Sequence, residues 1–395
     1  MFADWKGLVV ATGTTVLLAA SYTGSAVAED CTVRIGATGP LSGAAVAWGL
    51  SAKLGTEFAA ALVNKDGGLK VGEKRCQAKV VSFDAQYTAV GGAAASNYFA
   101  SENIHVVLGP VGSPETTGFR PVAKRNNQVN FSSSYMRDAI SPEFPLAFHA
   151  LQTPLTWGPI IIKRAKDQFG FKTVLITAPN DQGGTDGGRQ LAKLYGDVGV
   201  QATEEYYQRG TTNFAPLAQR IMNAKPDAIE FSSVPPVDGI GLVKALREAG
   251  YSGVLGALGG TGLKSLAEGA GGVENLNSVY WLEINPADNP GIIKMKEDYR
   301  RLMGAEPPEN SLFPTFVLAS EVALQGISLA GTDQDAERIA EAMRKSVPES
   351  RYMGKAGWRG KTLNGINQEL TFPVGLGMIV NGKRLPVQTV EIPTE

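Results

Sequence analysis

Cysteine and histidine are scarce in this chain. Its 395 residues include two cysteines and two histidines, and no Cys-x-x-Cys or His-Glu-x-x-His spacing occurs, which excludes the common zinc and dithiol motifs. No Gly-x-Ser-x-Gly turn is present, and the carboxylates form no obvious acid/base pair. His105 and His149 each fall in a predicted strand, where a lone histidine is usually structural. We therefore expect no enzyme activity, no metal site and no cofactor.

An excess of charge of either sign is also missing. Lys and Arg number 37 against 38 Asp and Glu, for a net charge of −1, and there is no basic run. This balance gives no indication of nucleic acid or an anionic membrane as a partner. With 43% hydrophobic and 19% charged residues, the composition is that of a globular protein, and the length allows two domains.

Long apolar runs are absent except near the N-terminus. Lys6 precedes an apolar run of 14 residues, 7–20, which is too short to span a bilayer. Ala26-Val27-Ala28 then fits a small-x-small cleavage site. We expect residues 1–28 to be a cleaved signal peptide and the mature chain to be soluble in the periplasm; a membrane anchor or a buried helix is the alternative.

The two cysteines, Cys31 and Cys76, would be exposed to an oxidising compartment after export. Each stands at the entrance of a predicted strand, and the two strands should be neighbours. The positions therefore favour a disulfide that ties the strand starts together. Two separate buried thiols are the alternative.

The most informative stretch of the chain lies between those cysteines and just beyond them. A strand at 32–36 leads into Gly39-Pro40-Leu41-Ser42-Gly43, a helix ends at 64–68, and a second strand covers 78–83. This order predicts a βαβ unit, with the glycine-rich turn at the carboxyl edge of a parallel sheet, where α/β proteins hold ligands. The turn lacks Gly-x-Gly-x-x-Gly, so it is not a dinucleotide fingerprint.

Strands and helices continue to alternate after this unit, and the alternation starts again near residue 173. The pattern predicts an α/β fold of two doubly wound parallel-sheet lobes. The expected strands are 105–108, 129–131, 148–152, 173–177, 200–207, 227–232, 253–258 and 278–283. The expected helices are 89–102, 113–126, 184–196, 214–224, 237–249, 291–303 and 312–330. The tail, 358–390, reads as strands and turns, with a hairpin signal at Asn381-Gly382.

The order of several short motifs resembles the type I periplasmic solute-binding proteins, most closely the branched-chain amino acid receptors of ABC importers. The motifs are the 39–43 turn, Trp48-Gly49, Asn64-Lys65-Asp66-Gly67-Gly68-Leu69, Gly109-Pro110 and Met353-Gly354-Lys355-Ala356-Gly357-Trp358. The resemblance implies a monomer that binds a small molecule and delivers it to a membrane permease.

It also implies a three-strand hinge, with the chain crossing between lobes near Gln152, Glu283 and Tyr352. The N-terminal lobe would then hold 29–152 plus 285–352, and the C-terminal lobe 153–284 plus 353–395.

Candidate ligand-binding residues of the first lobe follow predicted strands. Ser113 and Pro114 read as the N-cap and first position of a helix, whose free N–H groups suit a carboxylate; simple capping is the alternative. The resemblance gives Ser113 the ligand carboxylate. It also places Ser134, Tyr135 and Met136 at the pocket, and Trp48 in the glycine-rich turn would touch the same small molecule.

The second lobe departs from the family pattern. Its expected ligand contacts are Gln182, Val234 and Leu258, and Leu258 stands where amino acid receptors place an acidic residue. A buried ammonium without a carboxylate is costly, so the sequence favours an aromatic or aliphatic acid over an α-amino acid. Asp181 could still supply the missing charge, which leaves amino acids or amides open. A sensor that signals to a membrane partner is the alternative of another class.

Overall fold

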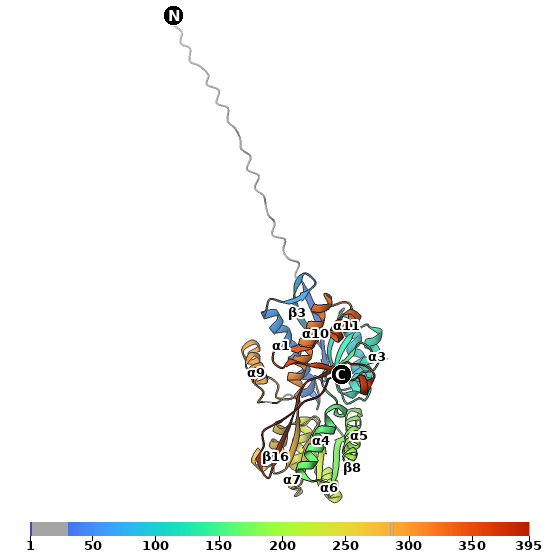
Figure 1. The fold of residues 1–395 in the computed structure, drawn as a ribbon, viewed down its shortest axis with the longest axis vertical. Helices are drawn as coiled ribbons and strands as arrows, with labels where there is room; N and C mark the ends of the chain where they lie inside the picture. The colour runs from blue at the N-terminus through green and yellow to red at the C-terminus, as the bar shows by residue number, and fades with distance from the viewer. Residues whose placement is uncertain (2–30, 285, 287, 395) are drawn as a thin grey trace.

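The computed structural model describes Met1 and residues 31–394, apart from 285 and 287. The expected signal peptide therefore lies, beyond Met1, outside the described residues. The described chain forms two lobes, one above the other in Figure 1, and the strands and helices alternate in both. Each lobe has a central sheet of mostly parallel strands, as the alternating pattern predicts.

The first lobe is built on an eight-stranded sheet in the order β14-β15-β6-β5-β4-β1-β3-β2. In that order the strands are Gly357–Arg359, Glu369–Thr371, Ala147–His149, Val129–Ser133, Val106–Val111, Thr32–Gly39, Lys74–Asp84 and Leu69–Val71. Its helices are α1 (Val46–Lys65), α2 (Ala89–Ser101), α3 (Ser113–Arg125), α9 (Pro290–Met303), α10 (Leu312–Ala330), α11 (Ala336–Lys345) and α12 (Lys361–Asn364). A short hairpin joins β12 (Glu349–Ser350) to β13 (Gly354–Lys355).

The second lobe has the sheet order β17-β16-β11-β10-β9-β7-β8, and β18 pairs with β16. In that order the strands are Lys383–Arg384, Val374–Val380, Val279–Glu283, Val254–Ala257, Ala228–Phe231, Thr173–Pro179 and Gln201–Tyr207, with β18 at Gln388–Val390. The helices are α4 (Pro154–Phe169), α5 (Gln182–Asp197), α6 (Ala215–Ala224), α7 (Pro236–Glu248) and α8 (Leu263–Gly269), with a 3-10 turn, η1, at Val273–Asn275. The expected hairpin at Asn381-Gly382 joins β16 to β17.

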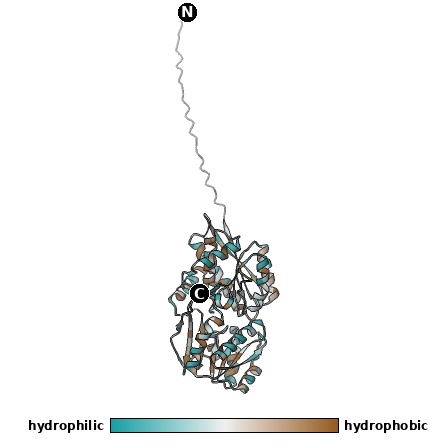
Figure 2. Cartoon of the chain, turned by 45° about the vertical axis from the view of Figure 1, so that its right-hand side comes forward, coloured by the Kyte–Doolittle hydropathy of each residue, from teal (hydrophilic) through white to brown (hydrophobic). Residues whose placement is uncertain are grey.

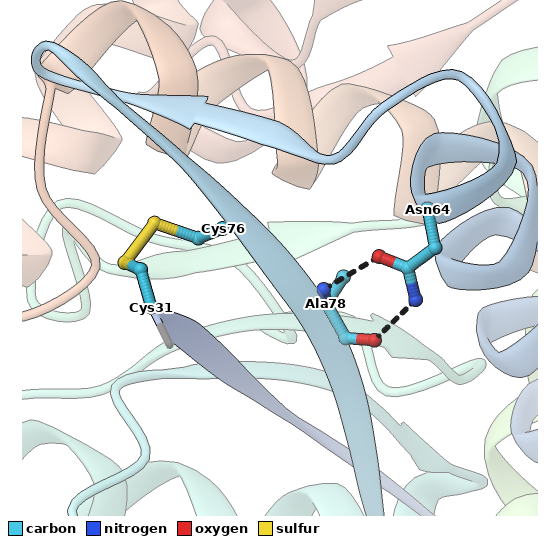
Figure 3. The surroundings of a disulfide bond; sticks show 4 residues. All are labelled: Cys31, Asn64, Cys76 and Ala78. Carbon is cyan, nitrogen blue, oxygen red and sulfur yellow. Dashed lines mark hydrogen bonds between the residues drawn. A yellow bond between two sulfur atoms is a disulfide. The ribbon is translucent and has the colours of Figure 1, made fainter. Parts of the chain in front are cut away.

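The first βαβ unit forms as expected. β1 runs parallel to β3 from the pair Thr32–Gln77 to the pair Gly39–Asp84, and a disulfide joins Cys31 to Cys76 at the start of this ladder (Figure 3). The Asn64 side chain, at the end of α1, bonds the N–H and C=O of Ala78 and so fixes the helix to β3. The hairpin partner β2, which the sequence pattern did not predict, makes Cys76 an interior residue of its strand.

The third crossover between the lobes is not where the resemblance implied. The expected position near Tyr352 would give all later residues to the second lobe, but β14 and β15 extend the sheet of the first lobe. The reason is packing: Trp358 of β14 and Leu370 of β15 are buried in the core cluster of the first lobe. The chain enters the second sheet only with β16, so residues 357–371 belong to the first lobe and the crossing falls between Thr371 and Val374.

Each lobe has its own hydrophobic core. In the first, β-strand residues such as Phe131 and Phe148 pack against α10 and α11; in the second, two clusters cover the two faces of the sheet. Hydrophobic residues accordingly occur throughout both lobes in Figure 2. Among the described helices, α10 alone is long and apolar enough to cross a membrane, and it is mostly buried against the core of the first lobe.

Candidate functional site

A cleft lies between the lobes, where the carboxyl ends of both sheets meet. It encloses about 630 Å³, including the solvent at its mouth. In the first sheet, β1 lies between β3 and β4, and in the second sheet β7 lies between β8 and β9. At both positions the chain stops adding strands on one side and continues on the other, so the strand order reverses there. Such switch points are where α/β sheets bind ligands. The lining residues are Trp48, Tyr87, Val111, Gly112, Ser113, Ser133, Ser134, Tyr135, Leu151, Gly183, Ser233, Gly260, Ile284, Asn310, Ser311 and Leu312.

Ser113 presents a hydroxyl to this cleft from the start of α3. The sequence predicts it as the N-cap, but the N-cap is Gly112 and Ser113 is the first helical residue. Its side chain therefore makes no capping bond, and its buried Oγ makes no hydrogen bond of ordinary length, although it lies near enough to the Asp186 carboxylate of the other lobe to favour the ionised form of that group. The first-turn N–H groups of a helix also favour a negatively charged group.

Ser134 presents a second unpartnered hydroxyl, from the loop after β5. The loop is held by His149, whose ring lies between the backbone of Ser134 and the carbonyl of Leu151. Burial lowers the pKa of His149, so the neutral ring can accept from the Ser134 N–H at 3.0 Å while its other nitrogen donates to Leu151. His149 therefore has a structural role, as a lone histidine in a strand usually does.

Three aromatic rings form the apolar wall. Trp48 and Tyr135 were expected here; Tyr87 was missed, although it follows the carboxyl end of β3. The ring centroids of Trp48 and Tyr87 lie 5.9 Å apart. The buried Glu115 accepts a 2.8 Å hydrogen bond from the Tyr87 N–H and one from the Val111 N–H, and burial raises the pKa of Glu115 to about 8.

The second lobe contributes two glycines and a serine rather than the expected side chains. Its lining residues are Gly183, Ser233 and Gly260. Val234 and Leu258 are buried in the hydrophobic clusters of their own lobe and do not line the cleft. Gln182 instead bonds Thr117 across the lobe boundary.

Met136 of the first lobe is also absent from the lining. Its side chain lies against Thr117, with the sulfur 3.7 Å from the Thr117 hydroxyl oxygen. These four residues stood one position from a lining residue or at a strand end, and sequence spacing does not show which way such a side chain points.

Charged groups lie behind the cleft wall, and no charged side chain is among the described residues that line it. Asp181 caps α5 and is held by two bonds from the guanidinium of Arg209, so its carboxylate is already paired. The same guanidinium lies 4.5 Å from the Tyr87 ring centre and 5.4 Å from that of Trp48. Arg137 is exposed.

Asp186, on α5, is a further carboxylate close to the cleft. It lies beside Ser113 of the other lobe, and burial raises its pKa although Ser113 and Gln182 both favour its ionised form. Its buried Oδ2 makes no hydrogen bond of ordinary length. Sequence reasoning did not single it out, because a position one turn into a helix gives no indication that it faces another lobe.

Residues 32–372 match the periplasmic binding protein family. The chain belongs to that family. Among its relatives, the Leu/Ile/Val-binding protein BraC3 of Rhizobium johnstonii is 26% identical over 331 residues, which is 80% of this chain and 85% of the relative. A leucine-, isoleucine-, valine-, threonine- and alanine-binding protein of Pseudomonas aeruginosa is 22% identical and covers 84% of this chain and 87% of its own length.

Solved periplasmic binding proteins share the fold. The leucine-binding protein LivK of Thermotoga maritima superposes with a TM-score of 0.73 at 19% identity, over 91% of this chain and 99% of the other. The branched-chain amino acid transporter substrate-binding protein LivJ of Streptococcus pneumoniae, in complex with isoleucine, gives 0.74 at 17% identity, over 92% and 100%. The protein is a solute-binding receptor of this type, and the cleft between the lobes is its candidate binding site.

Proposed function

We propose that this receptor closes around a small solute with a carboxylate head and an uncharged apolar body, and delivers it to the permease of an ABC importer. The observation that carries the proposal is the pair of buried, unpartnered hydroxyls of Ser113 and Ser134 in one cleft. A buried hydroxyl without a partner is costly, and a carboxylate accepts from two donors at once. Export to the periplasm, argued from residues 6–28, belongs to the same proposal.

The lining supports the uncharged body. Trp48, Tyr87 and Tyr135 offer ring surface, and Leu151, Ile284 and Leu312 add aliphatic surface. No carboxylate is among the described lining residues, and Asp181 is occupied by Arg209. An α-ammonium that met only these lining residues would lose its hydration without gaining a counter-charge, which costs several kcal/mol.

An α-amino acid is the second candidate, and Asp186 is the observation that favours it. Its unpartnered Oδ2 lies beside Ser113, where an ammonium next to a bound carboxylate could meet it. The names of the relatives, which bind leucine, isoleucine and valine, favour the same solutes.

Calorimetry with matched solutes separates the two candidates. 4-Methylpentanoate is leucine without its amino group, and 3-phenylpropanoate is phenylalanine without its amino group. We expect at least one of these acids to bind more than tenfold tighter than its amino acid, and Asp186→Asn to leave that binding intact. If leucine binds at micromolar concentration or below, the acids do not, and Asp186→Asn abolishes leucine binding, the second candidate is correct.

A further inference from the structure

The aromatic residues of the first lobe contact glycines of the second. A β-carbon at Gly183 would lie 2.4 Å from the Tyr87 hydroxyl oxygen, and one at Gly259 would lie 2.6 Å from the Tyr135 hydroxyl oxygen. Real β-carbon contacts are essentially never shorter than 3.0 Å. The lobes therefore approach this closely because side chains are missing from the second lobe at these positions.

Tyr87 has little freedom to move away from Gly183. The ring also packs against Gly112 of its own lobe, where a β-carbon would lie 2.2 Å from Tyr87 Cε2. The Arg209 guanidinium lies 4.5 Å from the ring centre. The backbone N–H of Tyr87 is fixed by the buried carboxylate of Glu115, and its φ is +56°, in the left-handed region. The ring is thus held from several sides when the lobes are together.

Within its own lobe, Gly183 has room for a methyl group. Apart from Tyr87, the nearest atom to a β-carbon there is Asp181 Oδ1 at 3.5 Å, an ordinary contact. Gly183 is a residue of α5 and does not have a positive φ, so alanine suits its backbone. The clash with Tyr87 arises only when the two lobes are in contact.

We propose that Gly183 is a positioning residue for closure: because it has no side chain, the Tyr87 hydroxyl can occupy the space beside its α-carbon when the lobes close. A methyl group at this position holds the lobes apart by its contact with Tyr87, while the second lobe folds normally. The inference rests on the proposed closure of the receptor around a solute, and it concerns the geometry of closure rather than the identity of the solute.

Distances between nitroxide labels test the proposal without requiring a known ligand. One label is placed at Lys65→Cys in the first lobe and the other at Asn223→Cys in the second, both exposed positions. Pulsed dipolar spectroscopy then gives the closed and open populations, without solute and with 4-methylpentanoate or leucine. We expect Gly183→Ala to lower the ratio of closed to open molecules at least tenfold.

Two further variants make the result specific. Gly196→Ala adds a methyl to the same helix where no atom lies within 4 Å, so the closed population should equal that of the unsubstituted protein. Tyr87→Phe removes the atom that clashes, so the Gly183→Ala/Tyr87→Phe double variant should regain most of the closed population. A purely structural effect of Gly183→Ala on α5 would not respond to a hydroxyl on the other lobe.

The proposal is overturned if Gly183→Ala closes as readily as the unsubstituted chain, if Tyr87→Phe fails to restore closure, or if no closed population occurs in the unsubstituted protein under any of these conditions. Failure of both probes to bind in calorimetry would count against the proposed solute class alone, because the populations without solute still decide the role of Gly183.

Discussion

Ser113 and Ser134 each hold a buried hydroxyl without a hydrogen-bond partner in the cleft. For Ser113→Ala we expect weaker binding of the preferred carboxylic acid by about 1.5–3 kcal/mol, the range for a hydrogen bond to a charged group. The stability of the ligand-free protein should change little, because the Ser113 hydroxyl makes no hydrogen bond of ordinary length. Calorimetry and thermal unfolding measure the two effects, and exposed Ser101→Ala is the control. A loss of stability without a loss of affinity would give Ser113 a structural role.

Glu230 shows the opposite situation, a buried carboxyl with its partners in place. It accepts from the Leu258 N–H at 2.7 Å and from the Tyr195 hydroxyl at 2.6 Å, and burial raises its pKa to about 7. Between about pH 4.5 and 7 the folded protein therefore keeps a proton that the unfolded chain has lost. The free energy of unfolding should fall as pH rises through this window, by up to about 1.4 kcal/mol per pH unit from this group.

Urea unfolding at pH 5 and pH 8 tests this expectation for Glu230. The Glu230→Gln variant should show a shallower decline than the unsubstituted protein, whereas exposed Glu297→Gln should not change it. Glu115 and Glu369, whose pKa values burial raises to about 8 and about 7, contribute to the slope that remains, as do Asp186, Asp238 and Glu321, whose pKa values burial also raises. An unchanged slope in Glu230→Gln would mean that Glu230 is ionised throughout.

Among the elements, the disulfide joins the beginnings of β1 and β3 and closes a chain separation of 45 residues. Cross-links of this kind stabilise by about 2–4 kcal/mol, mainly through the unfolded chain. We expect Cys31→Ser/Cys76→Ser to lower the free energy of unfolding by that amount. The intact mass of the protein purified from the periplasm should be two hydrogens below that of the reduced chain. Titratable thiols in that protein would contradict the bond.

Local patterns predicted most elements because each helix and strand buries its apolar positions within its own lobe. The assignment of β14 and β15 was wrong because short strands can pair with either sheet, and burial of Trp358 in the first core decides between them. The difference between contacts within one lobe and contacts between lobes also decides which cleft residues could be predicted. Ser113, Ser134 and Tyr135 follow strand ends of one sheet, so their common edge could be predicted, whereas Tyr87 and Gly183 meet only through the relative placement of two lobes.

At the scale of the whole molecule, side chains bridge the lobes beside the cleft. The Thr117 hydroxyl and the Gln182 amide bond across it, Gln190 donates to the Tyr135 carbonyl, and Lys264 pairs with Glu309. Each is a polar contact at least partly open to water, worth little by itself. Most molecules should therefore be open without solute, with a minor closed population, and a bound solute should shift them to the closed form by adding its own contacts to both walls.

Solution scattering tests this closure directly. We expect the radius of gyration to fall when a binding acid is added to saturation, and the scattering of the bound form to agree with the structure described above, in which side chains bridge the lobes. Binding to the folded chain alone should also stabilise it by about 2.7 kcal/mol at a hundredfold excess over the dissociation constant, which appears as a higher melting temperature. If the melting temperature rises while the radius of gyration stays constant, the solute binds without a hinge motion, and the bridging contacts hold the lobes together permanently.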